Sequence, residues 1–367
     1  MFSEIKKNLG FGCMRFPLKG FMIDYKKCSE MFDYFLENGF NYFDTAHGYH
    51  LGKSEIAVRK CLVKRHPRES YVLTNKLTDT YFKKESDIKP FFEKQLKICG
   101  VDYFDFYLMH AQNAELFEKY KKCRAYEQAF ELKEQGKIKH VGISFHDTAE
   151  VLDKILTEYP QIEVVQIQLN YLDYDSSSVQ GGKCYEVCRK HNKPIIVMEP
   201  VKGGTLANLP DKAKDILQSL NGGSPASYAI RYAAGFDGVI MTLSGMSNME
   251  QVKDNLSYMK DFKKLNEKEM CAIEQVKQVF KSMNLIDCTA CRYCVEGCPS
   301  KILIPDLFAC LNQKSIQKWN AKFYYKSVYT KKNGKASSCI KCGKCEKICP
   351  QHLPIRELLK KVSKEFD

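Results

Sequence analysis

The sequence predicts an α/β protein in which a (β/α)8 barrel is followed by a small, mainly helical domain. Three observations lead to this prediction. Short apolar runs alternate with amphipathic stretches through residues 1–275. There are eight such units, which matches the count and size of a closed parallel barrel. Eight of the 17 cysteines then gather in two similar runs within residues 276–367, so we place the domain boundary between residues 275 and 276.

The eight expected strands are short runs rich in apolar residues. They lie at residues 9–14, 40–44, 71–76, 104–110, 140–144, 164–170, 194–200 and 238–245. The clearest helices between them lie at residues 24–39, 89–100, 125–137, 148–160 and 224–235. A doubly wound open sheet is the alternative, but no G-x-G-x-x-G follows the first strand.

Polar residues stand where the expected strands stop. They are Asp44, Lys76, His110, Ser144, Asn170, Glu199 and Ser244. Any one of them is explained by a strand that ends in a polar turn. In a barrel, however, all these ends lie on the face where such enzymes carry out their chemistry. The set therefore indicates an active site.

The segments that contain these residues resemble the aldo-keto reductases over most of residues 5–260. The motifs on which this resemblance rests are DTAHGY at 44–49 with GKSE at 52–55, TNK at 74–76 and YLMH at 107–110. The resemblance implies a catalytic tetrad of Asp44, Tyr49, Lys76 and His110. Taken alone, a tyrosine or histidine in such a place is more often a packed core residue.

The implied roles agree with the chemistry of carbonyl reduction, which needs a hydride on carbon and a proton on oxygen. Tyr49 is the expected general acid, and a buried, cationic Lys76 stabilises its phenolate. Asp44 pairs with Lys76. His110 orients the carbonyl and stabilises the developing negative charge on its oxygen.

The resemblance also implies NADPH, or NADH, across the strand ends. Ser144, Gln168 and Asn170 match positions at the nicotinamide, and Gly203 and Gly204 lie in a phosphate-spanning loop. The segment 243–256 resembles the phosphate and adenosine site, with the candidates Ser244, Gly245, Ser247, Gln251 and Asn255. Many family members carry a basic residue just before this helix. Here Lys253 is the nearest candidate, so the choice between NADP and NAD stays open.

The two cysteine runs are CTACRYCVEGCP at 288–299 and CIKCGKCEKICP at 339–350. The spacing C-x2-C-x2-C-x3-C-P holds [4Fe–4S] clusters in bacterial ferredoxins, where the fourth cysteine ligates the other cluster. We therefore expect two cubes. One is ligated by Cys288, Cys291, Cys294 and Cys349, and the other by Cys339, Cys342, Cys345 and Cys298. Zinc sites use two CxxC pairs for each ion, which makes zinc the weaker interpretation.

Helical spacing is also visible around the cysteine runs. Ile304, Leu307, Phe308 and Leu311 predict a helix between the two runs, and a second helix is expected after Pro354. The module thus resembles helical two-cluster ferredoxin modules, and over its whole length the chain resembles a subgroup of microbial aldo-keto reductases with such an extension.

The net charge of +13 is concentrated in this second domain. Residues 281–367 contain 17 Lys or Arg and 7 Asp or Glu, a net +10. Some lysines offset the negative charge of ligated clusters, and the rest favour an acidic redox protein over nucleic acid as partner. A merely solvated lysine surface is an equally good interpretation. No apolar run of membrane-spanning length and no signal peptide occur, so we expect a cytoplasmic protein without membrane contact.

The predicted function is NAD(P)H-dependent reduction of a small aldehyde or ketone, coupled to or accompanied by iron–sulfur electron transfer. Hydride transfer moves two electrons together, whereas a cube passes one at a time. A flavin would join the two, but no flavin motif is visible. A structural role for the clusters is one alternative. Another is an electron-transfer or redox-sensing subunit whose barrel binds nicotinamide with little turnover.

Overall fold

The computed structural model describes residues 2–176, 179–220, 222–283, 285–316 and 321–367. The chain forms two compact units. The first comprises Met1–Ser176, Gln180–Pro200 and Ala229–Leu265, and the second is formed mainly by Val201–Tyr228 and Asn266–Asp367. The second unit therefore includes a stretch that lies well before residue 276 in the sequence.

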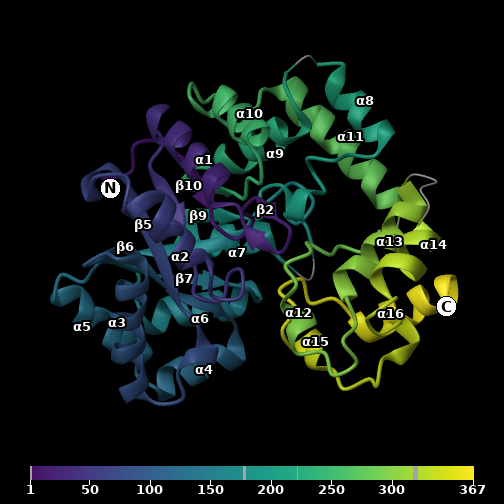
Figure 1. The fold of residues 1–367 in the computed structure, drawn as a ribbon. Helices are drawn as coiled ribbons and strands as arrows, with labels where there is room; N and C mark the ends of the chain where they lie inside the picture. The colour runs from purple at the N-terminus through teal and green to yellow at the C-terminus, as the bar shows by residue number, and fades with distance from the viewer. Residues whose placement is uncertain (1, 177–178, 221, 284, 317–320) are drawn as a thin grey trace. The chain divides into compact units, whose positions relative to one another are not determined.

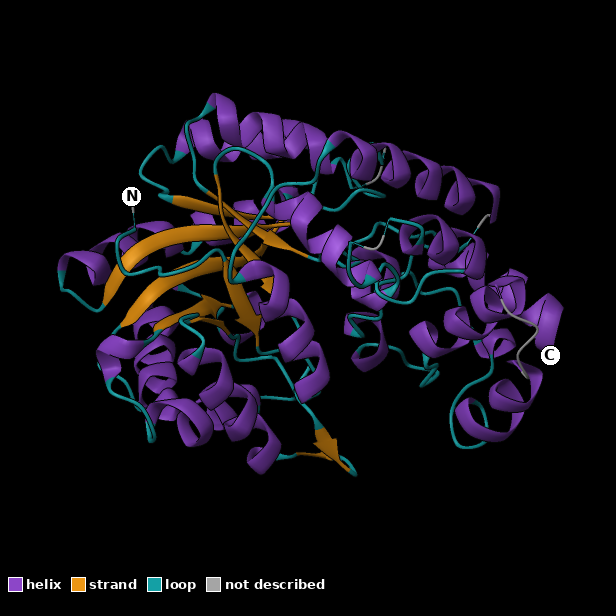
Figure 2. Ribbon diagram, turned by 90° about the horizontal axis from the view of Figure 1, so that it is seen from above, coloured by secondary structure: helices purple, strands orange, loops and turns teal. Residues whose placement is uncertain are grey.

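Eight parallel strands close into a barrel, seen as the orange ribbons in Figure 2. They are β1 (Leu9–Gly12), β4 (Tyr42–Asp44), β5 (Val72–Leu77), β6 (Phe104–Gln112), β7 (Ile138–Phe145), β8 (Val164–Gln168), β9 (Ile195–Met198) and β10 (Val239–Ser244). Strand β1 pairs with both β4 and β10, and this closes the sheet. The predicted barrel is confirmed, and the open sheet is excluded. The short hairpin of β2 (Leu18–Lys19) and β3 (Met22–Ile23) was not predicted.

Helices alternate with the strands along the chain (Figure 1). They are α1 (Tyr25–Glu37), α2 (Ser54–Val58), α3 (Ile88–Cys99), α4 (Ala114–Lys122), α5 (Ala125–Glu134), α6 (Ala149–Glu158), α7 (Gly181–Lys190), α8 (Asp211–Gln218), α9 (Pro225–Ala234), α10 (Met249–Met259) and α11 (Glu267–Met283). All five helices expected from the sequence are present. In the part of the chain that the structure describes, no helix is both long and apolar enough to cross a membrane.

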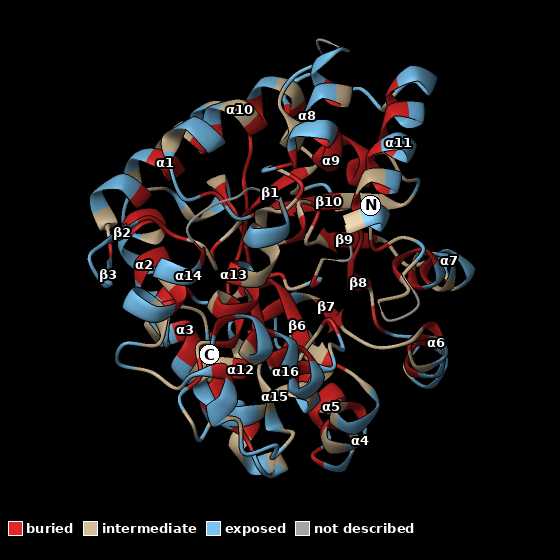
Figure 3. Cartoon of the chain, turned by 90° about the vertical axis from the view of Figure 1, so that its right-hand side faces the viewer, coloured by how far each residue is buried: buried red, intermediate tan, exposed pale blue. Residues whose placement is uncertain are grey.

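The barrel interior is filled by side chains from many strands. One cluster joins Tyr42, Phe106, Met241 and Leu243, which are buried, with further aliphatic residues from β5, β8 and β9. Figure 3 shows the barrel strands largely in the colour of buried residues. The centre is thus a packed core, so chemistry is confined to the rim where the strands end.

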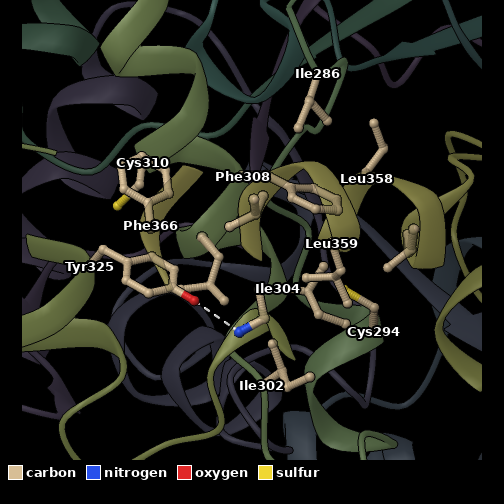
Figure 4. Packing of buried hydrophobic residues seen from close by; sticks show 14 of the residues in the cluster. Ile286, Cys294, Ile302, Ile304, Phe308, Cys310, Tyr325, Leu358, Leu359 and Phe366 are labelled. Atoms are coloured by element: carbon tan, nitrogen blue, oxygen red, sulfur yellow. Dashed lines mark hydrogen bonds between the residues drawn. The ribbon is translucent and has the colours of Figure 1, made fainter. Parts of the chain in front are cut away.

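The cysteine-rich part of the second unit is built from short helices around a small core. The helices are α12 (Tyr293–Glu296), α13 (Ile304–Ile316), α14 (Ala321–Phe323), α15 (Lys344–Lys347) and α16 (Ile355–Phe366). Phe308 and Leu359 pack in this core, and Ala336 donates its backbone N–H to the Tyr325 hydroxyl at 2.9 Å (Figure 4). The two helices expected here are present as α13 and α16.

Candidate active site and cysteine centres

Lys76 and Asp44 form a buried ion pair at the carboxyl ends of β5 and β4. Lys76 Nζ lies 2.5 Å from Asp44 Oδ1 and donates to the Thr45 carbonyl oxygen at 3.0 Å. Gln166 of β8 donates its side-chain amide to Asp44 Oδ2 at 3.2 Å. Lys76 has no exposed surface. A buried ammonium is tolerated only when it is paired and hydrogen-bonded, and these contacts meet that requirement.

Tyr49 and His110 lie beside this pair. Lys76 Nζ is 5.1 Å from the centroid of the Tyr49 ring, and the Tyr49 and His110 rings meet edge to face with their centroids 6.0 Å apart. His110 Nδ1 lies 2.7 Å from the Thr78 hydroxyl oxygen. Burial, and then the Lys76 cation, lower the pKa of His110 well below its ordinary value. The structure thus brings the four residues of the expected tetrad together, with a neutral imidazole near neutral pH.

A buried polar network supports the loop that carries Tyr49. His47 Nδ1 lies 2.5 Å from Glu55 Oε2. The other oxygen, Glu55 Oε1, accepts hydrogen bonds from Asn75 at 2.8 Å and from Gln95 at 3.0 Å. Asn75 directly precedes Lys76, so the network ties the Tyr49 loop to the lysine strand. The sequence prediction did not identify Asn75 and Gln95 as supporting residues. Glu55 and Asn75 both lie in the motifs quoted above, but their contact with each other and with Gln95 was not predicted.

The residues expected at the nicotinamide lie at the ends of β7 and β8. Ser144, Gln168 and Asn170 are all buried. Gln168 and Asn170 both donate their side-chain amides to Asp173 Oδ2, at 2.7 and 2.6 Å. The carboxylate of Asp173, which sequence reasoning missed, therefore fixes the orientation of both amides in advance of ligand binding.

The residues expected at the adenosine end lie on β10 and around the start of α10. Ser244 Oγ accepts from the Asn255 amide at 2.8 Å, and Gln251 Oε1 accepts from the Ser247 backbone N–H at 2.7 Å. Gly245 is exposed. These contacts hold the β10–α10 turn in one conformation.

A basic residue near this turn comes from a distant part of the chain. A Cβ on Gly245 would lie 3.3 Å from the side chain of Arg15, and Ser247 Oγ donates to the Arg15 carbonyl oxygen at 2.8 Å. Lys253, the candidate chosen from sequence, has its Nζ 5.8 Å from the ring centroid of Tyr34. Arg15 belongs to the loop after β1 and is far from α10 in the sequence, so proximity along the chain did not point to it.

Gly203 and Gly204 belong to the second unit. Gly203 has φ +63°, and a Cβ there would lie only 2.2 Å from the Thr289 carbonyl oxygen. The neighbouring Lys202 is buried, with Nζ 3.9 Å from Asp287 Oδ1. The loop after β9 therefore packs closely against the first cysteine loop, and only glycine satisfies both the conformation and the space.

The eight motif cysteines surround two hollows. Among the described residues, no three His, Cys, Asp or Glu side chains converge closely enough to bind a single metal ion. Instead, Cys288, Cys291, Cys294 and Cys349 line one hollow. A second hollow is lined by Cys298, Cys339, Cys342 and Cys345. Each set is three cysteines of one run and the fourth of the other, so the donor set fits the [4Fe–4S] arrangement expected from the spacing.

The two hollows differ in exposure. Burial raises the pKa of the Cys345 thiol to about 11 and that of Cys294 still further. Cys294 is 8% exposed and belongs to the local core, whereas Cys342 is exposed. The first set thus contains a buried cysteine and the second an exposed one, and we call the first hollow the inner one and the second the outer one.

Comparison with known proteins decides the family. A model described as the aldo/keto reductase family matches residues 8–278. The chain belongs to the aldo/keto reductase family. A second model, described as a 4Fe-4S dicluster domain, matches residues 287–354 of this aldo/keto reductase. The predicted family and the predicted cluster-binding extension are confirmed. The enzyme class, an oxidoreductase of aldo-keto reductase type, is confirmed at the level of the family.

Individual relatives are similar to part of this chain. The NADH-specific methylglyoxal reductase of Escherichia coli is 26% identical over 185 residues, which are 46% of this chain and 54% of that protein. This chain thus spans about half the length of that relative. Mouse aldo-keto reductase family 1 member C13 is 28% identical over 234 residues, which are 54% of this chain and 68% of the relative.

Solved structures show the same barrel. An aldo-keto reductase from Bacillus halodurans in its holo form has a TM-score of 0.58 at 25% identity, and the match covers 74% of this chain and 92% of that one. An aldo-keto reductase from Klebsiella pneumoniae in complex with NADPH has a TM-score of 0.61 at 18% identity, covering 74% and 95%. At this identity the second likeness speaks for the fold alone.

Proposed function

We propose that this aldo/keto reductase reduces a small aldehyde or ketone to an alcohol with NADPH or NADH. The observation that carries the proposal is the arrangement of Tyr49 beside a fully buried Lys76, which Asp44 holds at 2.5 Å. A fixed cation next to a phenol favours proton release from that phenol. Without the Lys76–Asp44 pair, no buried cation would favour proton release from the Tyr49 phenol.

Each residue of the tetrad has one task in this mechanism. The nicotinamide, when bound, supplies the hydride. Tyr49 donates its phenolic proton to the carbonyl oxygen, and Lys76 stabilises the phenolate that remains. Asp44 balances the lysine charge. The role proposed for His110 places the proton of the neutral ring on Nε2, which donates to the carbonyl oxygen and orients it; the Thr78 hydroxyl, 2.7 Å from Nδ1, then donates to Nδ1.

The proposed cofactor contacts come from three groups of residues. Ser144, Gln168 and Asn170 hold the nicotinamide amide. Gly203 and Gly204 lie along the phosphates. The residues at the adenosine end are Ser244, Gly245, Ser247, Gln251 and Asn255, to which we add Arg15, whose guanidinium attracts phosphate.

In the second unit we propose two [4Fe–4S] clusters. Cys288, Cys291, Cys294 and Cys349 hold the inner one, and Cys298, Cys339, Cys342 and Cys345 hold the outer one. The likeness to a 4Fe-4S dicluster domain and the cysteine sets of the two hollows support this proposal. The cytoplasmic location and the absence of nucleic-acid binding stay predictions.

Turnover of an aldehyde panel by anaerobically purified protein tests the carbonyl reductase. Tyr49→Phe is expected to lower kcat by roughly 10²–10⁴-fold, the usual effect of a general acid. Tyr185→Phe is the matched control, because it removes only a hydroxyl that donates to the Asp237 carbonyl oxygen at 3.1 Å. If Tyr49→Phe keeps the wild-type rate, the tetrad assignment is wrong. If the wild type turns over no carbonyl, the redox-sensing alternative replaces it.

A further inference from the structure

The second cysteine run presents an exposed face that the carbonyl reduction does not use. We name it the lysine face and define it by Ile340, Lys341, Cys342, Lys344, Lys347 and Ile348. Ile340 is 65% exposed and Ile348 51% exposed. Cys342 and the three lysines are exposed as well. Two exposed isoleucines and three exposed lysines thus stand within residues 340–348 of the chain.

The charge of this face is not neutralised by neighbouring side chains. Its one carboxylate, Glu346, is already paired with Arg356, with Arg356 Nε 2.8 Å from Glu346 Oε2. Lys341, Lys344 and Lys347 form no ion pair with any described residue of the chain. Part of their charge offsets the negative charge of a thiolate-ligated cluster, and the remainder gives the face a positive potential.

We propose that the lysine face is the docking site of a small acidic one-electron carrier protein. Exposed isoleucines together with lysines that form no ion pair with a described residue have the composition of a transient protein interface, in which apolar side chains make contact and the charges steer an acidic partner. Nucleic acid would use the lysines but leave the isoleucines unexplained.

The position of the face gives the docking a redox purpose. Cys342 and the neighbouring Cys339 and Cys345 line the outer hollow together with Ile340 and Lys344, so a docked carrier touches the outer cluster's own loop. The thiolates around this hollow would hold the outer cluster, which would accept one electron from the docked carrier, so that the carrier is oxidised as the cluster is reduced. No bond forms or breaks and no proton moves. The inference rests on the two clusters of the proposed function.

A second exposed surface of the same module supplies a matched control. Phe323 is 52% and Val328 48% exposed, and Lys322, Lys326 and Lys331 are exposed near them. This surface has the same kinds of side chain, but none of its residues lines either cysteine hollow. Charge reversal there changes the net charge of the protein equally and leaves the lysine face intact.

The experiment is anaerobic titration calorimetry of the full-length holoprotein with a purified, small, acidic ferredoxin, at low and at high salt. We expect binding that weakens with salt, and a loss of about tenfold or more in affinity for K341E/K344E/K347E. K322E/K326E/K331E is expected to bind within about twofold of the wild type, and I340Q/I348Q to lose less than the triple reversal. Iron analysis of every variant shows whether the clusters are retained. K341Q/K344Q/K347Q replaces the reversal if that variant loses iron.

Three results would overturn the proposal. One is no affinity for the acidic carrier at low salt. Another is equal weakening by the two charge reversals, which would mean a general basic field. The third is tighter binding of duplex DNA or RNA to the same lysines. None of these depends on carbonyl turnover, and the iron content of the wild type tests the clusters separately. Failure of the docking proposal is therefore distinguishable from failure of the proposed function.

Discussion

The barrel rim and the cysteine module position their functional side chains in different ways. At the rim, Lys76 and Asp44 are held by strand pairing and by a buried hydrogen-bond network, so their contact exists without any ligand. In the module the cysteines lie within or close to α12 and α15, each only four residues long. Their hollows are part of the small core. Long-range pairing thus organises the first site, whereas we expect the second to depend on the clusters proposed for its thiolates.

Loss of one inner ligand tests this dependence and has the largest expected effect. Cys294→Ser removes a thiolate from a residue that is also part of the local core. We expect the iron content to fall by about half or more and the second unit to unfold at lower temperature, while barrel secondary structure persists. Iron analysis and circular dichroism measure both.

Cys310→Ser provides the control for that variant. Cys310 is fully buried in the same core but lines neither hollow. The Cys310→Ser variant should have a lower free energy of unfolding, because core packing is disturbed, and it should retain its iron. Equal iron loss in both variants would show that the core, and not ligation, sets the cluster content.

A substitution at the barrel rim should lower the catalytic rate while the barrel stays folded. Lys76→Met is expected to lower kcat by roughly 10²–10⁴-fold and to cost about 3–5 kcal/mol of unfolding free energy, because Asp44 is left buried and unpaired. Adding Asp44→Asn should recover most of the stability and none of the rate. Urea unfolding and steady-state kinetics check this; recovery of both would assign the pair a purely structural role.

The loop at Gly203 was predicted from sequence as a phosphate-spanning loop of the cofactor site, and within the second unit it packs on a cysteine loop. Gly203→Ala forces a Cβ to 2.2 Å from the Thr289 carbonyl oxygen. We expect a loss of about 1–3 kcal/mol in the second unit and weaker NADPH binding. Gly136→Ala has the same left-handed conformation, φ +73°, with nothing within 4 Å. A similar loss in both would leave only backbone strain as the cause.

The smallest effect concerns pH. Burial lowers the pKa of His110 in the folded state, so below the ordinary histidine pKa of about 6.5 the unfolded chain binds the proton more readily. This contribution to stability is present above about pH 6.5 and is lost as the pH falls toward the folded pKa. His110→Gln should show a flatter dependence of unfolding free energy on pH over that range. An unchanged slope would mean that other groups control it.

The barrel, its eight strands and the two sets of cysteines expected as cluster ligands all follow from the order of residues in the chain. Strand and helix periodicity are local properties, and polar residues at strand ends mark one rim once the sheet closes. The spacing C-x2-C-x2-C-x3-C is likewise local, and the exchange of the fourth cysteine between the two runs is a property of the motif itself. Both expected ligand sets therefore follow from spacing alone.

Tertiary folding was needed to place Asn75 and Gln95 on Glu55, Arg15 beside Gly245, and Gly203 against Thr289. Each of these contacts joins residues far apart in the chain. Their proximity depends on how loops return to the barrel or pack within the second unit, which no periodicity encodes. The exposure of Ile340 and Ile348 could not be predicted from the sequence for the same reason. Whether an apolar residue is covered depends on what the rest of the chain places over it.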